Sequence, residues 1–165
     1  MIRLDDTTPI EARARLLEQL ARDAARTPAV LRLLETCQQL SGPTFSARAL
    51  AEQILSLVHR YRYAPTLPGE WVPESIDEVI SARAGDCKGL TALALALFAS
   101  AGIQARATWL LAPTEQQARG VSDGRPRNHV LPQVYVDGAW WSAETTRPGA
   151  RLTLSTQTQA QTEAR

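Results

Sequence analysis

The residue most suited to covalent chemistry in this sequence is Cys87, which follows Gly85-Asp86 and opens a stretch rich in leucine and alanine. If that stretch is a helix, the unpaired N–H groups and the positive end of the dipole at its start favour a thiolate. The same N–H groups can donate to an oxyanion on an attacked carbonyl. This location therefore suits a nucleophile, although a small buried side chain explains a lone cysteine equally well.

A thiolate nucleophile needs a histidine, and the chain contains only His59 and His129. His59 lies among apolar residues of a predicted amphipathic helix, where an ordinary helix residue is expected. His129 follows a long polar segment and begins a predicted hairpin. We therefore predict that His129 is the base that serves Cys87.

A carboxylate near the histidine is predicted from the register of the hairpin. Asp137-Gly138 is typical of a two-residue turn, and this turn puts His129 opposite Thr146. Glu144 is then the diagonal neighbour of His129 on the same face, at about 7–8 Å between Cα atoms. A side chain of this length can reach the imidazole. We predict that Glu144 orients His129 and stabilises its protonated form.

The same register separates two faces of the hairpin. The face with Val134 is apolar, whereas Gln133 and Tyr135 share the face of His129 and are expected to line a cleft under the helix of Cys87. Pro132 has no N–H to donate to a ladder, so we expect an edge strand or a bulge close to it.

Helices are predicted to build the first third of the chain. Apolar residues recur at helical spacing from Pro9 to about Leu40, with an interruption at Thr27-Pro28, and again from Phe45 to about Arg62. Proline is favoured in the first turn of a helix, so Pro28 is expected to begin a second helix. We therefore predict three helices, followed by an irregular segment and a short helix over residues 75–82.

The apolar helix that begins at Cys87 is expected to be buried on every side. Asp86 is its predicted N-cap and Gly102 its C-terminal glycine. From Ile103 to Leu111 apolar and polar residues alternate, which predicts a strand with one buried face. The polar segment from Pro113 to Asn128 is predicted to be a long surface loop of the kind that often acts as a lid.

Three blocks of sequence resemble the core of the transglutaminase-like superfamily. They are Gly85-Asp86-Cys87-Lys88-Gly89-Leu90, Asn128-His129-Val130 and the segment from Val134 to Thr146, within a resemblance that covers about Arg60 to Thr146. The resemblance implies an α+β, papain-like transglutaminase core in which the nucleophile helix packs on an antiparallel sheet. It implies the catalytic set Cys87, His129 and Glu144, where the family usually has Asp at the third position. The upstream segment looks like that of small bacterial and phage-encoded members.

One domain is predicted over residues 1–154, with a helical N-terminal part (1–62) and a catalytic core (63–154), followed by a disordered tail (155–165). The formal net charge of +1 provides no field that would attract nucleic acid. No apolar stretch reaches the roughly 20 residues of a membrane span, and no signal peptide is recognised, so a cytoplasmic location is expected. No metal-ligand cluster or phosphate loop is evident, and no cofactor is expected.

The sequence leaves two functions open. In the first, the chain is a cysteine-dependent amide hydrolase or acyltransferase that acts on a peptide or protein amide through Cys87, His129, Glu144 and a thioester. Hydrolysis is the preferred reaction because the chain is small. In the second, the chain is a catalytically inert transglutaminase-like binding or structural module, which could belong to a phage particle. Trp71, Gln53 and Tyr63 are candidates for a second oxyanion donor, each with an equally good packing role.

Overall fold

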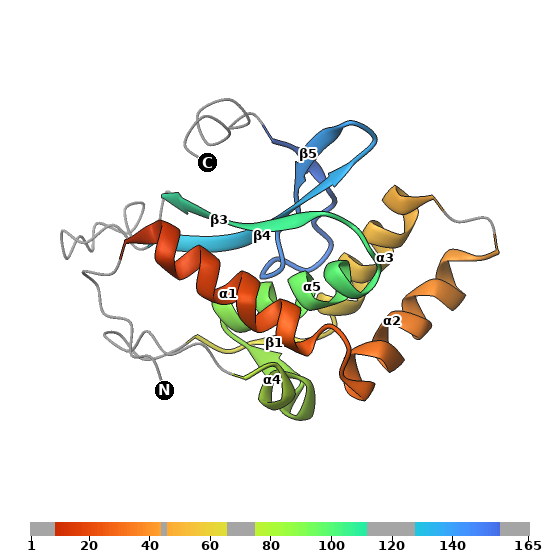
Figure 1. The fold of residues 1–165 in the computed structure, drawn as a ribbon, viewed down its shortest axis with the longest axis horizontal. Coiled ribbons are helices and arrows are strands. Elements are labelled where there is room, and N and C mark those ends of the chain that lie inside the picture. Colours follow the sequence, from red (N-terminus) through yellow and green to blue (C-terminus); the bar gives the residue numbers. More distant parts are fainter. Residues whose placement is uncertain (1–8, 44–45, 66–74, 112–127, 156–165) are drawn as a thin grey trace.

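The computed structural model describes residues 9–43, 46–65, 75–111 and 128–155. These residues form an α+β fold, with helices on one side of a four-stranded sheet (Figure 1). The helices are α1 (Ile10–Ala24), α2 (Pro28–Ser41), α3 (Ala47–Val58), α4 (Ile76–Ala82) and α5 (Cys87–Ser100). The strands are β1 (Arg62–Tyr63), β2 (Ala84–Gly85), β3 (Ala105–Leu111), β4 (Asn128–Val136), β5 (Ala139–Ser142) and β6 (Thr153–Leu154).

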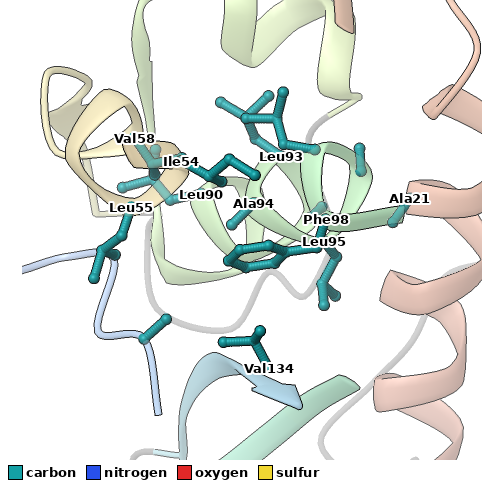
Figure 2. Packing of buried hydrophobic residues seen from close by; sticks show 14 of the residues in the cluster. Ala21, Ile54, Leu55, Val58, Leu90, Leu93, Ala94, Leu95, Phe98 and Val134 are labelled. Atoms are coloured by element: carbon teal, nitrogen blue, oxygen red, sulfur yellow. The ribbon is translucent and has the colours of Figure 1, made fainter. Parts of the chain in front are cut away.

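The central helix is α5, which the other helices and the sheet enclose (Figure 1). Its leucines and Phe98 are fully buried, and Leu95 and Phe98 lie above Val134 of the sheet (Figure 2). The carboxylate of Asp86 accepts the N–H of Gly89 at 2.8 Å and so caps the helix. At the other end, Gly102 has a φ of 72°, the left-handed conformation that favours glycine. The predicted limits of this buried helix are confirmed.

Two other helix starts also agree with the sequence pattern. The break between α1 and α2 falls at Thr27-Pro28, with proline in the first turn of α2. The short helix α4 begins with a capping box, in which the Ser75 hydroxyl accepts the N–H of Glu78 and the Glu78 carboxylate accepts the N–H of Ser75. After α4 the chain enters β2, the two-residue strand that precedes Cys87.

The large sheet is antiparallel, with the strand order β3-β4-β5-β6. Asp137 and Gly138 form the turn between β4 and β5, with φ angles of 52° and 74°. Val136 pairs with Ala139 and Val134 with Trp141, so the predicted register of the hairpin is confirmed. The ladder ends at the pair Gln133 and Ser142, and beyond it the chain leaves the sheet.

The prediction that Pro132 requires an edge strand or a bulge is wrong. β4 lies inside the sheet, and Pro132 pairs with Ala107 of β3 without a break in register. The carbonyl of Pro132 accepts the N–H of Ala143 at 2.9 Å, so the backbone of this residue is directed toward the β5 side. The missing N–H of proline would point to the same side, opposite Ala143, and the β4–β5 ladder ends one pair earlier, at Gln133 and Ser142.

The prediction of one buried face for β3 is also wrong. Arg106 and Thr108 are buried as well as Ala107. Arg106 is tolerated there because its Nε donates to Gln133 at 2.9 Å and its guanidinium stacks on the ring of Trp140 at 3.9 Å. The second face of the sheet thus carries a polar and aromatic layer.

This layer also corrects the expected position of Gln133 and Tyr135. Val134 packs against α5, and side chains alternate along a strand, so Gln133 and Tyr135 are directed away from that helix where β4 pairs with β5. His129 belongs to the same face but lies four residues earlier in β4, outside that ladder. Gln133 donates to Ser155 at 2.7 Å instead of lining a cleft under α5. Ser155, the first residue of the predicted tail, therefore belongs to the sheet edge.

The rest of the predicted tail and the polar loop before Asn128 lie outside the described residues. Asn128 itself is the first residue of β4. The helices of the described ranges are all too short or too polar to cross a membrane.

Candidate active site

Cys87 is the first residue of α5 and is partly exposed, so its thiol sits where the N–H groups of the first turn converge. Asp86 and Lys88, the residues on either side of Cys87, stabilise the start of the helix. Asp86 and Lys88 form a buried ion pair next to the cysteine, while the second carboxylate oxygen of Asp86 caps Gly89. A charge-paired lysine adds little net field at the thiol, so the local positive potential comes from the helix terminus.

A two-residue parallel pairing fixes the chain that leads into Cys87. β1 pairs with β2 through Arg62 and Ala84, and through Tyr63 and Gly85. The N–H of Ala64 then donates to the carbonyl of Gly85 at 2.9 Å. The residues just after α3 are thereby anchored two positions before the thiol.

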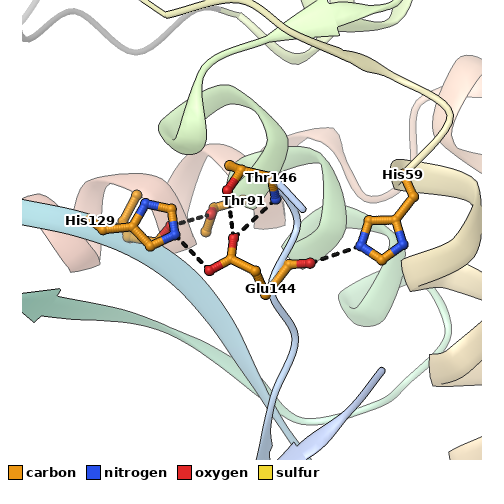
Figure 3. Close-up of polar contacts among 6 residues, drawn as sticks. His59, Thr91, His129, Glu144 and Thr146 are labelled. Carbon is orange, nitrogen blue, oxygen red and sulfur yellow. Dashed lines mark hydrogen bonds and ion pairs between the residues drawn. The ribbon is translucent and has the colours of Figure 1, made fainter. Parts of the chain in front are cut away.

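His129 and Glu144 meet as the hairpin register predicts. Nε2 of His129 lies 2.7 Å from one carboxylate oxygen of Glu144, and both side chains are about one-fifth exposed, at 21% and 20% (Figure 3). The other carboxylate oxygen accepts two hydrogen bonds from Thr146, from its backbone N–H at 3.0 Å and its hydroxyl at 2.7 Å. The longer side chain of glutamate is thus fixed at both oxygens.

Helix α5 and strand β4 approach each other beyond the end of the β4–β5 ladder. The hydroxyl of Thr91, one turn into α5, donates to the carbonyl of Val130 in β4 at 3.3 Å. The carbonyl of Val130 lies on the same edge of β4 as that of Pro132, beyond the last rung of the β4–β5 ladder. The first turn of α5 therefore lies beside the residue that follows His129.

The electrostatics of the site favour an imidazolium. A hydrogen bond between the side chains of His129 and Cys87 contributes most, and the hydrogen bond with Glu144 comes next. Together they raise the pKa of His129 to about 10 against the opposing effect of burial. Burial is the largest single influence on Glu144 and would raise its pKa, but hydrogen bonds from His129 and Thr146 lower that pKa to about 2. His129 thus lies between the side chains of Cys87 and Glu144 in one chain of contacts.

His59 has a contact that its sequence context does not indicate. Its Nε2 lies 2.8 Å from the backbone carbonyl oxygen of Glu144, 85 positions along the chain (Figure 3). The expectation of an ordinary helix residue is therefore incomplete. The pattern around His59 is that of any amphipathic helix end, so only the tertiary structure reveals the contact.

The remaining candidates have other environments. Cys37 is fully buried and its thiol faces the backbone carbonyl of Gln53 in α3, at 3.8 Å. Burial raises the pKa of the Cys37 thiol to about 11, so this cysteine is not activated. Trp71 lies outside the described residues, and Tyr63 is half exposed beside Gly85. The described ranges contain no cluster of three metal-ligating side chains.

Comparisons with known proteins find relatives of this fold. The core profile of the transglutaminase-like superfamily matches residues 34–145. A solved structure of a candidate cysteine protease from Cytophaga hutchinsonii superposes with a TM-score of 0.53 at 20% identity, over 76% of this chain and 42% of that protein. A solved structure named as a TGase gives 0.52 at 15% identity, over 95% of this chain and 38% of that protein.

These two likenesses concern the fold, because both identities are low. The chain spans less than half the length of either solved protein. No curated protein matches the sequence significantly.

Proposed function

The chain belongs to the transglutaminase-like superfamily, and on this basis we propose that it hydrolyses an amide bond of a peptide or protein through Cys87, His129 and Glu144. The observation that supports the proposal is the continuous contact from the thiol to the imidazole and on to the carboxylate. The raised pKa of His129 and the lowered pKa of Glu144 give each group the charge that its proposed role needs.

The proposed reaction begins with attack of the Cys87 thiolate on the amide carbonyl carbon. A C–S bond forms, and the carbonyl oxygen becomes an oxyanion. The imidazolium of His129 gives its proton to the leaving nitrogen, the C–N bond breaks, and the amine departs from a thioester. His129, now neutral, takes a proton from water as the water attacks the thioester. The acid is released and the thiolate re-forms beside an imidazolium.

The start of α5 supplies the first donor for the oxyanion. The carboxylate of Asp86 occupies the N–H of Gly89, and the carbonyl of Asp86 accepts the N–H of Leu90 at 3.0 Å. The N–H of Cys87 precedes these bonds at the very start of the helix, next to the thiol. We assign it to the oxyanion, where a donor of this kind stabilises the charge that develops in the transition state.

The acceptor that resolves the thioester decides between hydrolysis and acyl transfer. Water gives an acid, whereas a primary amine gives a new amide with the same enzyme groups. Casein offers both scissile peptide bonds and glutamine side chains, and a fluorescent primary amine reports transfer. Hydrolysis is the proposed outcome: new carboxylates or ammonia appear from casein, and little of the fluorescent amine is incorporated.

The matched variants for this experiment are Cys87→Ala and Cys37→Ala. The first is expected to abolish turnover, and the second to leave it within about twofold, because Cys37 is buried away from the site. In parallel, iodoacetamide near neutral pH is expected to modify Cys87 and not Cys37. Equal rates for the two thiols, or turnover that survives Cys87→Ala, would instead favour an inert binding or structural module.

A further inference from the structure

His59 lies at the end of α3, where it is the C-cap residue, and it joins this helix to the segment that carries Glu144. The ring is half-buried, and the distance of 2.8 Å from its Nε2 to the Glu144 carbonyl is that of a good hydrogen bond. The proposed mechanism gives this second histidine no role. Its contact with a proposed site residue therefore needs a separate explanation.

The backbone of Glu144 lies beyond the hairpin ladder. The β4–β5 ladder ends at Ser142, two residues before it. The N–H of Ala143 still bonds to Pro132, but the contacts from Thr146 to the carboxylate come from the same short segment and cannot anchor it to the fold. Within the described ranges, His59 makes the one hydrogen bond that ties the Glu144 backbone to another element.

The direction of this bond is set by chemistry. A backbone carbonyl only accepts, so Nε2 of His59 must carry a hydrogen and donate it. The neutral ring with hydrogen on Nε2 and the protonated ring both meet this condition. The bond therefore does not depend on a change of charge at His59, and its effect is geometric.

The position of His59 in the chain links the two ends of the site. Three residues after it, β1 begins, and β1 pairs with β2, which leads directly into Cys87. The segment that contains His59 and β1 therefore bonds to Glu144 and also pairs with β2, the strand before Cys87. A shift of Glu144 relative to α5 would have to break the contact with His59.

We propose that His59 is a positioning residue of the site: its hydrogen bond to the Glu144 backbone holds the carboxylate where it can bond to His129. The inference rests on the proposed function, and it adds a residue that acts through Glu144 without touching the substrate. Loss of the donor is expected to weaken the Glu144–His129 contact, because no other hydrogen bond within the described residues joins the segment after Ser142 to α3 or its cap.

The experiment compares three replacements of His59. His59→Gln keeps an N–H donor at a distance from the backbone similar to that of Nε2, His59→Asn carries the same amide on a shorter side chain, and His59→Phe keeps a ring without a donor. The readouts are the NMR titration of the His129 Cε1–H signal and turnover of casein. Only one other histidine is present in the wild type, so the His129 signal is assigned directly in each variant.

The Phe and Asn variants are expected to lower the midpoint of His129 by about half a pH unit or more, and kcat by about fivefold, with little change in KM. His59→Gln is expected to restore both. If the His59 ring only fills space, the variants should rank in the opposite order: His59→Phe should have a midpoint and kcat close to those of the wild type, and both amide variants should be impaired. That order, or unchanged midpoints in the Phe and Asn variants, would overturn the proposal.

Two further controls keep the result decisive. Circular dichroism melting checks each variant for folding, and if His59→Phe does not fold, the Gln and Asn pair alone gives the answer. Failure of the proposed function would give another result: His129 of the wild type would titrate near the ordinary pKa of 6.5. That result would overturn both the proposed function and the positioning role of His59. A raised wild-type midpoint with no effect of His59 would overturn the positioning role alone.

Discussion

Replacing Glu144 by Gln tests the electrostatic basis of the site most directly. Glutamine has the same length and keeps an oxygen that can accept from Thr146, but it carries no charge. In the wild type, one carboxylate oxygen bonds to His129 at 2.7 Å and the other accepts both bonds from Thr146. The variant therefore removes the negative charge beside the imidazole while it changes the shape of the site very little.

The expected change follows from the strength of a hydrogen bond to a charged partner. Such bonds contribute roughly 1.5–3 kcal/mol, and about 1.4 kcal/mol corresponds to one pKa unit. The pair is about one-fifth exposed, so water screens part of the interaction. We expect the pKa of His129 to fall by about one unit in Glu144→Gln, from a wild-type value of about 10. The contact with Cys87 is the larger cause of the raised pKa, so Cys87→Ala is expected to lower it further.

The measurement is an NMR titration of the His129 Cε1–H signal from pH 5 to pH 11, with His59→Gln to assign the two histidines. Glu35→Gln is the matched control, because it removes the same charge from an exposed position of α2. A wild-type midpoint near 6.5 would refute the reasoning. So would a Glu144→Gln midpoint equal to that of the control, or a larger fall for Glu144→Gln than for Cys87→Ala.

Four further results are expected. Burial raises the pKa of the Cys37 thiol to about 11, so iodoacetamide should label Cys37 at least about tenfold more slowly than Cys87 at pH 8, with equal labelling in urea, as mass spectrometry would show. Thr146→Val removes the hydroxyl bond and keeps the backbone N–H, so the midpoint of His129 should fall by less than in Glu144→Gln. Gly138→Ala strains a turn residue whose φ is 74°, and the free energy of unfolding in urea should drop by about 1 kcal/mol. The stabilisation from the His129–Glu144 pair should be complete between about pH 4.5 and 6.5. It should be lost as pH rises through about 10, because the pKa of His129 is raised in the folded state. It should also be lost as pH falls toward about 2, because the pKa of Glu144 is lowered in the folded state. Urea unfolding of the wild type and Glu144→Gln across this range checks both limits.

Local chemistry explains why much of the fold is predictable from the sequence. The helix of Cys87 is apolar on every side, begins at a capping aspartate and ends at a glycine, and each of these signals acts within a few residues. The Asp137-Gly138 turn sets the register of the hairpin in the same way. Because side chains alternate along a strand, this register predicts that Glu144 shares a face with His129. The ladder ends at Ser142, so the contact itself also depends on the path of the chain beyond it.

The errors occur where a side chain or a strand depends on distant partners. Arg106 is buried where Gln133 accepts from its Nε and Trp140 stacks on its guanidinium, and neither partner is close to it in the sequence. Pro132 is accepted inside a central strand at the end of the β4–β5 ladder, where its carbonyl still accepts the N–H of Ala143, and this depends on the path of the chain after Ser142. Residue type alone predicts neither outcome.

The sequence by itself determined the thiol at a helix start and the register of the β4–β5 hairpin, since cap and turn signals act over short distances. Only the tertiary structure decided that α5 lies against the open edge of β4, so that Cys87 reaches His129. It also decided that His59 bonds to Glu144 across 85 positions. Contacts of this length depend on how whole helices pack on the sheet, and no local pattern of residues encodes them.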